Sequence, residues 1–352
     1  MAQNVANAPA PAFRVPPATV ERPHPRLEQR HGQRHTYAAL DLGTNNCRLL
    51  IARPESEGFT VIDAFSRIVR LGEGMSQSGL LSGEAMERTV TALGVCADKL
   101  RRRNVSLSRS VATEACRRAA NGRSFVERVR EETGIALEII APQEEARLAM
   151  LGCHKLLEPG DGPAVIFDIG GGSTELVLID HDGATPRIRS WWSAPWGVVS
   201  LTESEGKEAI EGKDRVAAYK RMRERVRRSF DRFAETLPKD RQGIRLLGTS
   251  GTVTTLASVH LALPSYDRRA VDGLHVPIEA MHRISSMIAQ MDFDERSSLP
   301  CIGPDRADMV VAGCAILEAI LDIWPARNLG IADRGIREGI LRSLMARDGY
   351  AL

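Results

Sequence analysis

The chain has 352 residues, of which 43% are hydrophobic and 26% charged, and its net charge is +2. This length suffices for two domains, and the nearly neutral balance argues against a strongly basic nucleic-acid-binding protein. The longest nearly apolar stretch, Met309–Leu321, contains Glu318 and is too short to span a bilayer. We therefore expect a cytoplasmic protein that binds neither nucleic acid nor membrane. Its six cysteines form no C-x-x-C pair and are expected to be reduced thiols.

The first 35 residues differ in composition from the rest of the chain. They hold six of the eighteen prolines and several arginines and histidines, and they lack the apolar segment of a secretion signal. We expect residues 1–35 to be a disordered, mildly basic tail.

Strand-like patterns begin after this tail. Apolar runs over 37–43, 47–54 and 59–72 are bounded by Gly, Asn, Pro and Ser and predict three strands. Helical and strand periodicities then alternate. The predicted elements are helices over 82–103, 123–134 and 144–157, a strand ending near 113 that leads into a short helix, and a strand over 135–143. The Pro- and Gly-containing segment 158–163 predicts a domain boundary.

The second half repeats this beginning. A hairpin over 164–180 and a strand over 187–192 come first. Next come a long helix over 214–237, a strand over 244–251, a helix over 252–263 and several further helices. Because both halves open with a hairpin and continue into alternating elements, we predict a duplicated α/β protein with domains over 36–162 and 163–352.

Each hairpin carries an Asp-x-Gly turn where its first strand ends, at Asp41 and Asp168. Ligands of α/β folds lie at such strand ends, and glycines let backbone N–H groups approach an anion closely. Hydroxyl and amide groups at Thr44, Asn45, Ser173 and Thr174 add donors. Carboxylates at Asp41 and Asp168 suit a hydrated Mg²⁺ ion. One such turn is ordinary hairpin chemistry, whereas a matched pair predicts a site that binds a phosphate chain from both sides.

A third glycine turn lies between a predicted strand and the start of a helix, a further arrangement that favours anions. It comprises Gly248, Thr249, Ser250 and Gly251.

The three motifs resemble the phosphate motifs of the superfamily that contains sugar kinases, Hsc70-type chaperones and actin. The segments "VATEACRRAANG", "APQEEARLAMLG", "VIFDIGGGSTELVLID" and "GIREGIL" are similar, in this order, to the exopolyphosphatase and guanosine pentaphosphate phosphohydrolase (Ppx/GppA) family. The resemblance covers about residues 37–341. It implies two duplicated actin-like (ribonuclease H-like) domains that flank a phosphate-binding cleft.

The same resemblance assigns roles to individual residues. It places the water-activating carboxylate at Glu145; taken alone, a glutamate in the first turn of a helix can simply interact with the helix dipole. It places Glu175 beside the water and Asp168 at the metal. The phosphate-binding loop would be formed by Gly170, Gly171, Gly172, Ser173 and Thr174, opposed by Asp41, Thr44 and Asn45. Further phosphate contacts are implied for Arg70, Arg117 and Asn121.

Several functions remain open at this point. The first expectation is an Mg²⁺-dependent exopolyphosphatase, and the alternative is a guanosine pentaphosphate phosphohydrolase. A phosphotransferase that uses ATP is disfavoured because the third motif lacks a Gly-Gly pair. An inactive nucleotide sensor is disfavoured because Glu145, Asp168 and Glu175 are all retained. Longer family members continue into a helical HD-like domain, which we expect to be absent from this chain. The resemblance also suggests a homodimer.

Overall fold

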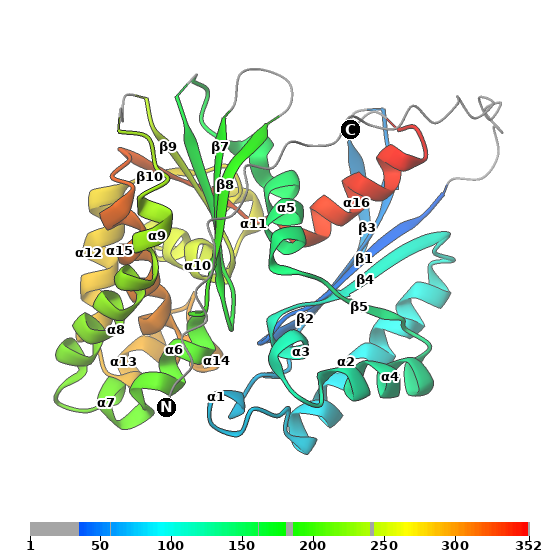
Figure 1. Cartoon of the computed structure of the whole chain (residues 1–352), viewed down its shortest axis with the longest axis horizontal. Coiled ribbons are helices and arrows are strands. Elements are labelled where there is room, and N and C mark those ends of the chain that lie inside the picture. Colours follow the sequence, from blue (N-terminus) through cyan, green and yellow to red (C-terminus); the bar gives the residue numbers. More distant parts are fainter. Residues whose placement is uncertain (1–34, 57, 161, 181–185, 240–242, 351–352) are drawn as a thin grey trace, which may run out of the picture. The chain divides into compact units, whose positions relative to one another are not determined.

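The computed structural model describes residues 35–56, 58–160, 162–180, 186–239 and 243–350. Residues 1–34 of the predicted tail lie outside these ranges. The described residues form two β-sheets with helices packed against them (Figure 1). This arrangement confirms the α/β prediction.

The first sheet has the strand order β3-β2-β1-β4-β5. The pairs β1–β2 and β2–β3 are antiparallel, whereas β1–β4 and β4–β5 are parallel. The central strands β1 and β2 are apolar runs that are mostly buried, whereas the edge strand β3 has no buried residue. The strands are β1 (Tyr37–Leu42), β2 (Asn46–Pro54), β3 (Phe59–Ile68), β4 (Leu107–Ala112) and β5 (Leu137–Ile139).

The second sheet repeats this topology. Its order is β10-β11-β9-β6-β7-β8. The pairs β6–β7 and β7–β8 are antiparallel, and β6–β9 and β9–β11 are parallel. Strand for strand, the series 8-7-6-9-11 matches 3-2-1-4-5, and β10 is an addition at the edge. The strands are β6 (Ala164–Ile169), β7 (Thr174–Asp180), β8 (Arg187–Ala194), β9 (Arg245–Thr249), β10 (His275–Pro277) and β11 (Asn328–Ala332).

Helices surround both sheets. Those of the first half are α1 (Met75–Ser78), α2 (Gly83–Arg102), α3 (Glu114–Arg118), α4 (Gly122–Thr133) and α5 (Pro142–Cys153), with the 3₁₀ turn η1 (His154–Leu156) after them. The later helices are α6 (Val198–Glu205), α7 (Lys207–Glu211), α8 (Arg215–Ser229), α9 (Asp231–Ala234), α10 (Gly251–His260), α11 (Arg268–Val271), α12 (Ile278–Gln290), α13 (Phe293–Ser298), α14 (Pro304–Ala307), α15 (Val310–Ile323) and α16 (Ile336–Arg347). No helix in the described ranges is both long and apolar enough to cross a membrane.

The structure differs from the predicted elements in several places, and among the described residues the helices α1, α6 and α7 were not predicted. The helix predicted over 214–237 is interrupted at Phe230, whose N–H bonds to the carbonyls of Arg227 and Arg228 and tightens the last turn of α8. The strands β10 and β11 were not predicted. β11 is a short apolar run that is almost wholly buried, and such a run has no periodicity that separates a strand from a helix.

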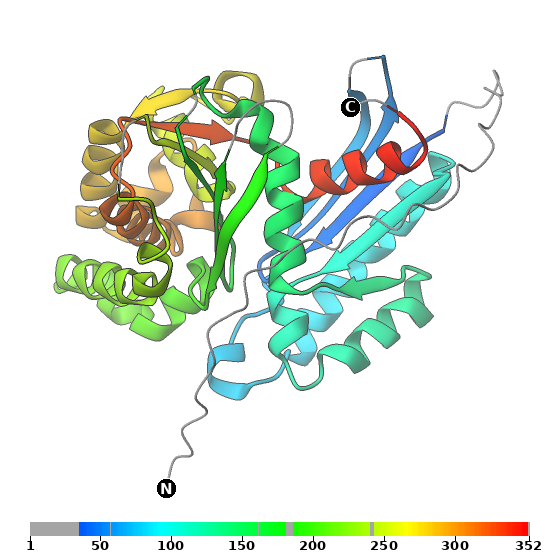
Figure 2. The same cartoon turned by 45° about the horizontal axis from the view of Figure 1, so that its top comes forward.

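The helices α5 and α16 cross between the two sheets (Figure 2). α5 follows the first sheet in sequence but packs Ala146 and Met150 into a core with the second sheet. α16 follows the second sheet but packs Ile340 and Leu344 against β1 and β2. Each half of the fold is thus completed by a helix from the other half of the sequence. The domain boundary near residue 162 stays a prediction.

Glycines permit this crossing. An ideal Cβ on Gly339 of α16 would lie 2.0 Å from the carbonyl oxygen of Leu148 in α5. A Cβ on Gly152 of α5 would lie 2.0 Å from the carbonyl oxygen of Gly335. Since no side chain tolerates either separation, the helix backbones can approach this closely only with glycine at both positions.

Candidate active site

Two hairpin turns of the same design form the centre of the site. In the β1–β2 turn the N–H of Gly43 donates to the carbonyl of Asn46, and in the β6–β7 turn the N–H of Gly170 donates to the carbonyl of Ser173, both at 2.9 Å. Asp41 and Asp168 occupy the next-to-last positions of β1 and β6. The duplicated sequence pattern therefore produces a duplicated local structure.

The segment that follows the third strand of each half braces each turn. The carbonyl of Asn45 accepts bonds from the N–H groups of Val69 and Arg70, at 2.8 and 3.0 Å. In the other half, the carbonyl of Gly171 accepts a bond of 2.8 Å from the N–H of Val199. Because the carbonyls of Asn45 and Gly171 accept hydrogen bonds on the side away from the pocket, the other side of each turn faces the pocket.

The two turns contact each other directly. An ideal Cβ on Gly171 would lie 3.0 Å from Cβ of Thr44 and 3.1 Å from the backbone nitrogen of Asn45. A Cβ on Gly172 would lie 2.8 Å from Oγ1 of Thr44 and 2.9 Å from Cγ of Glu114. The consecutive glycines are therefore needed for close approach, which brings the sequence-predicted phosphate loops of both halves to one place.

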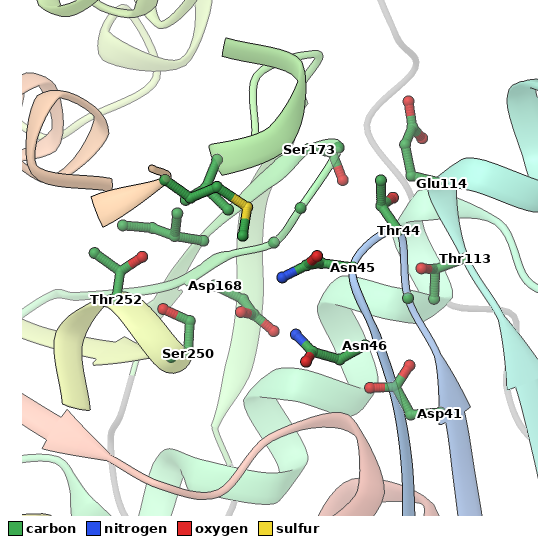
Figure 3. A pocket seen from close by; sticks show the side chains of 18 of the residues that line it. Asp41, Thr44, Asn45, Asn46, Thr113, Glu114, Asp168, Ser173, Ser250 and Thr252 are labelled. Atoms are coloured by element: carbon green, nitrogen blue, oxygen red, sulfur yellow. The ribbon is translucent and has the colours of Figure 1, made fainter. Parts of the chain in front are cut away.

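The third glycine motif closes the pocket from β9 and α10. Ser250 adopts φ 128° and ψ 171°, a backbone region in which residues other than glycine are strained. Its Oγ is buried, without a hydrogen-bond partner among the described residues. Figure 3 shows Ser250 and Thr252 across the pocket from Asn45 and Asn46. A strained residue with an unpaired hydroxyl is typical of a ligand site.

The two glutamates at the start of α5 point to different surroundings. Glu144 lies toward the surface, where it pairs with Arg109 and Arg147 at 2.8 and 2.7 Å. Glu145 is only 7% exposed and lines the pocket, and its Oε2 lies 3.2 Å from Nη1 of Arg117. The helical turn thus separates a surface ion pair from an inward carboxylate.

Arg117 connects Glu145 to its surroundings. Besides Glu145, its guanidinium donates to Oε2 of Glu114 at 2.5 Å and to the carbonyl of Ile140 at 2.7 Å. Glu114 is 8% exposed and lines the pocket. Arg117 itself does not line the pocket, and its hydrogen bonds position the two glutamates rather than reach into the cavity.

Glu175 is held by two serine hydroxyls. Its Oε1 accepts hydrogen bonds from Ser173 at 2.7 Å and from Ser193 at 2.9 Å, and only 2% of the residue is exposed. In the β6–β7 register Glu175 lies opposite Asp168. The two hydrogen bonds fix Oε1 of Glu175, and the strand register places the Glu175 carboxylate beside Asp168.

Four acidic side chains of the pocket, Asp41, Glu145, Asp168 and Glu175, have raised pKa values. Burial, reinforced by the charge of Glu175, raises the pKa of Asp168 to about 8. Burial also raises the pKa of Glu175 to about 7, although the bonds from Ser173 and Ser193 oppose the rise. The pKa values of Glu145 and Asp41 are raised as well, first by burial. Since Glu175, Asp41 and Asp168 all add to the rise at Glu145, the four carboxylates converge on one small region.

A divalent cation fits this arrangement. Oδ1 of Asp41 and Oδ1 of Asn45 are buried acceptors without a hydrogen-bond partner in the described part of the chain. Within that part, no three His, Cys, Asp or Glu side chains are grouped closely enough to hold a metal on their own. Mg²⁺ does not need such a cage, because it binds one or two carboxylates and keeps waters and substrate phosphate oxygens as its other ligands.

The pocket has a volume of about 140 Å³. Most of the predicted site residues line it, namely Asp41, Thr44, Asn45, Glu145, Asp168, Gly170, Gly171, Gly172, Ser173, Glu175, Ser250 and Gly251. Sequence reasoning missed Asn46, Arg48, Thr113, Thr252, Thr255 and Arg306, which also line it. Arg48 carried a usable signal, since it follows the first turn by two residues and faces Asp41 across β1 and β2. Arg306 lies far away in sequence and carried none.

Other predicted residues lie outside the pocket. Asn121 binds the backbone of Leu81, with Oδ1 accepting from its N–H at 2.9 Å and Nδ2 donating to its carbonyl at 3.0 Å. These bonds give no support to Asn121 as a phosphate ligand. The hydroxyl of Thr174 donates to the carbonyl of Trp196 at 2.7 Å, and that of Thr249 donates to the carbonyl of Arg334 at 2.7 Å.

Gly248 also lies behind the pocket rather than in its wall. An ideal Cβ on Gly248 would lie 2.5 Å from the ring of Phe167, so this glycine permits close packing between β9 and β6. Arg70 lines an adjacent cavity and pairs with Asp308 at 3.2 Å.

Comparison with known proteins decides the family. The family model described as the Ppx/GppA phosphatase family matches residues 50–348. The chain belongs to the Ppx/GppA phosphatase family. It is thereby a hydrolase, as predicted. The chain is 31% identical to Exopolyphosphatase 2 of Mycobacterium tuberculosis over 323 residues, which covers 87% of this chain and 98% of the relative.

Solved structures of Ppx/GppA proteins have the same fold. The Aquifex aeolicus family member is 30% identical, with a TM-score of 0.73 over 90% of this chain and 99% of that one. An exopolyphosphatase from Cytophaga hutchinsonii is 22% identical, with a TM-score of 0.79 over 89% of this chain and 98% of that one. These similarities confirm the fold that the sequence motifs implied.

Proposed function

We propose that this Ppx/GppA protein is an exopolyphosphatase that hydrolyses the terminal phosphate of inorganic polyphosphate. The observation that carries the proposal is the convergence of five carboxylates and three glycine-containing turns, drawn from both halves of the fold, on one pocket of about 140 Å³; the carboxylates are Asp41, Glu114, Glu145, Asp168 and Glu175. A pocket of this size has room for the end of a phosphate chain. The similarity to Exopolyphosphatase 2 supports the choice of substrate.

In this proposal Glu145 activates the attacking water. Its carboxylate accepts a proton from the water as the water oxygen attacks the terminal phosphorus, and the bridging P–O bond breaks. The chain leaves with the bridging oxygen, one phosphate shorter. Arg117 holds the Glu145 carboxylate in place, and its charge lowers the pKa of Glu145 against the opposing effect of burial. The bonds from Ser173 and Ser193 keep Glu175 oriented toward the same region.

The phosphate oxygens would be bound by three kinds of donor. Backbone N–H groups of the two turns and of the N-terminus of α10 provide the first kind. The hydroxyls of Thr44 and Ser250 provide the second, and the guanidinium groups of Arg48 and Arg306 provide the third. Asp41 and Asp168 would hold Mg²⁺, which when bound neutralises charge on the phosphate oxygens.

The proposal includes a cytoplasmic location. All six cysteines are free and buried, as expected of a protein from a reducing compartment.

The deciding experiment compares two neighbouring glutamates. Phosphate release is measured from long-chain polyphosphate and from guanosine pentaphosphate, with Mg²⁺ or with EDTA. Replacing the carboxylate of Glu145 in E145Q should lower kcat by at least about a hundredfold. The control E144Q alters the adjacent surface glutamate and should stay near the wild-type rate. Undiminished release by E145Q would exclude the mechanism, and release from the guanosine substrate alone would move the protein to that second activity.

A further inference from the structure

A second cavity, which we call the arginine cavity, lies beside the active-site pocket and has a volume of about 720 Å³. Its walls come from β2, β3, the loop after β3, α2 and α14. The lining residues are Asn46, Arg48, Ser66, Arg67, Ile68, Arg70, Glu73, Arg88, Asp305 and Arg306.

The arginine cavity and the active-site pocket have a common wall. Asn46, Arg48, Ile68 and Arg306 line both. The strand register explains the connection, because Asn46, at the end of the first turn, lies opposite Ile68 of β3. A ligand that extends beyond the pocket can therefore pass along this wall into the larger space.

The charge of the arginine cavity is strongly positive. Five of its ten lining residues are arginines, against two carboxylates. Arg88 pairs with Glu73 at 2.8 Å and Arg70 pairs with Asp308 at 3.2 Å. For the other three arginines no carboxylate within salt-bridge distance is found in the described part of the chain; they are Arg48, Arg67 and Arg306. The whole chain has a net charge of only +2, so this concentration of charge is local.

The composition of the wall favours a phosphate chain over a nucleoside. A purine base is usually bound by aromatic or apolar side chains that cover its faces. Among the described residues of this wall none is aromatic, and Ile68 is the single large apolar side chain. Guanidinium groups instead bind phosphate oxygens through paired N–H donors, at any position along a chain of repeating phosphates.

We propose that the arginine cavity binds the phosphate groups behind the terminal one, and that Arg67 and Arg88 thereby set a preference for long chains. The proposal rests on the proposed exopolyphosphatase function. Arg67 is the more informative of the two for mutation. It lies exposed on the edge strand β3, where its guanidinium contacts the ring of Phe65, whereas Arg88 also supports the backbone at Val69.

The kinetic test compares R67Q with R187Q. Both change an exposed arginine on an edge strand, but Arg187 lies on β8 of the other sheet, outside both cavities. The ratio of kcat/KM for long-chain polyphosphate to kcat/KM for tripolyphosphate should fall about fivefold to tenfold in R67Q, mainly through KM. The ratio should be unchanged in R187Q, and R67K should recover most of it because the charge is kept. An equal effect on both substrates, or none, would overturn the proposal.

A binding test separates this proposal from the function on which it depends. Long-chain polyphosphate is titrated into E145Q and into E145Q/R67Q at several salt concentrations. The second protein should bind about tenfold more weakly, and its dependence of log Kd on log salt should be shallower by about one unit. If the wild type released no phosphate from polyphosphate, the exopolyphosphatase function would fail while this titration still tested the cavity. Equal weakening of guanosine pentaphosphate binding by R67Q would contradict the choice of a phosphate chain.

Discussion

Arg48 and Glu175 occupy equivalent positions in the two hairpins. Arg48 lies opposite Asp41 in the β1–β2 register, and Glu175 lies opposite Asp168 in the β6–β7 register. The duplicated fold thus places a cation beside one aspartate and an anion beside the other. The positive charge of Arg48 opposes the rise in the pKa of both aspartates, whereas Glu175 adds to the rise at Asp168.

This relationship predicts a pH effect for R48Q. Removing the cation should raise the pKa of Asp168 further above about 8, so the rising limb of the pH–rate profile should shift to higher pH. We also expect kcat/KM to fall about tenfold or more, because a guanidinium on the pocket wall is lost. R48K keeps the charge and should leave the limb in place. Profiles of the wild type and both variants that coincide would contradict this role of Arg48.

The raised pKa values also predict that the metal-free protein loses stability as pH rises. Between about pH 4 and 8, folded Asp168 and Glu175 retain protons that the unfolded chain has released, so the free energy of unfolding decreases across this window. In EDTA, Tm should fall by about 5 °C or more over this range relative to D168N, which removes one of these groups. Mg²⁺ together with phosphate should reduce the fall. Parallel melting curves for the two proteins at every pH would argue against it.

The strain at Ser250 predicts opposite effects on stability and activity. Glycine adopts the backbone angles of Ser250 without strain, so S250G should raise the free energy of unfolding by about 1 kcal/mol, measured by chemical denaturation. Both S250G and S250A remove the hydroxyl and should lower kcat/KM for polyphosphate. S250A keeps the strain and should not gain stability. Full activity in S250A would mean that the hydroxyl does not bind substrate.

The crossing of α5 and α16 predicts unequal effects of two glycine substitutions. In G339A the new methyl group would meet the carbonyl of Leu148 at 2.0 Å, and we expect a loss of about 3 kcal/mol or more in the free energy of unfolding. Gly94 is also helical, but no atom lies within 4 Å of an added Cβ, so G94A should stabilise the protein by up to about 1 kcal/mol. Calorimetry of both variants would detect the contrast. Similar melting temperatures would show that the two helices can separate without loss.

Local patterns predicted the hairpins and their turns because those features depend on neighbours in sequence. Asp41 and Asp168 could be placed at strand ends from the apolar runs around them, and the structure agrees. Arg306 could not be predicted from local patterns, because it lies about 260 residues after the first turn. It reaches the pocket only through the packing of α14. Asn121 is a different case. Its similarity to a family motif suggested a ligand, whereas its amide secures the backbone of Leu81.

The exchange of helices between the halves also bears on how the chain folds during synthesis. The first sheet leaves the ribosome early, but its core includes Ile340, Leu341 and Leu344 of α16. Until residues 336–347 have left the ribosome, core side chains such as Tyr37 and Leu50 lack the apolar contacts that α16 provides. The first half therefore stays exposed to chaperones and to aggregation for most of translation, and both halves should reach their native packing together rather than in the order of the sequence.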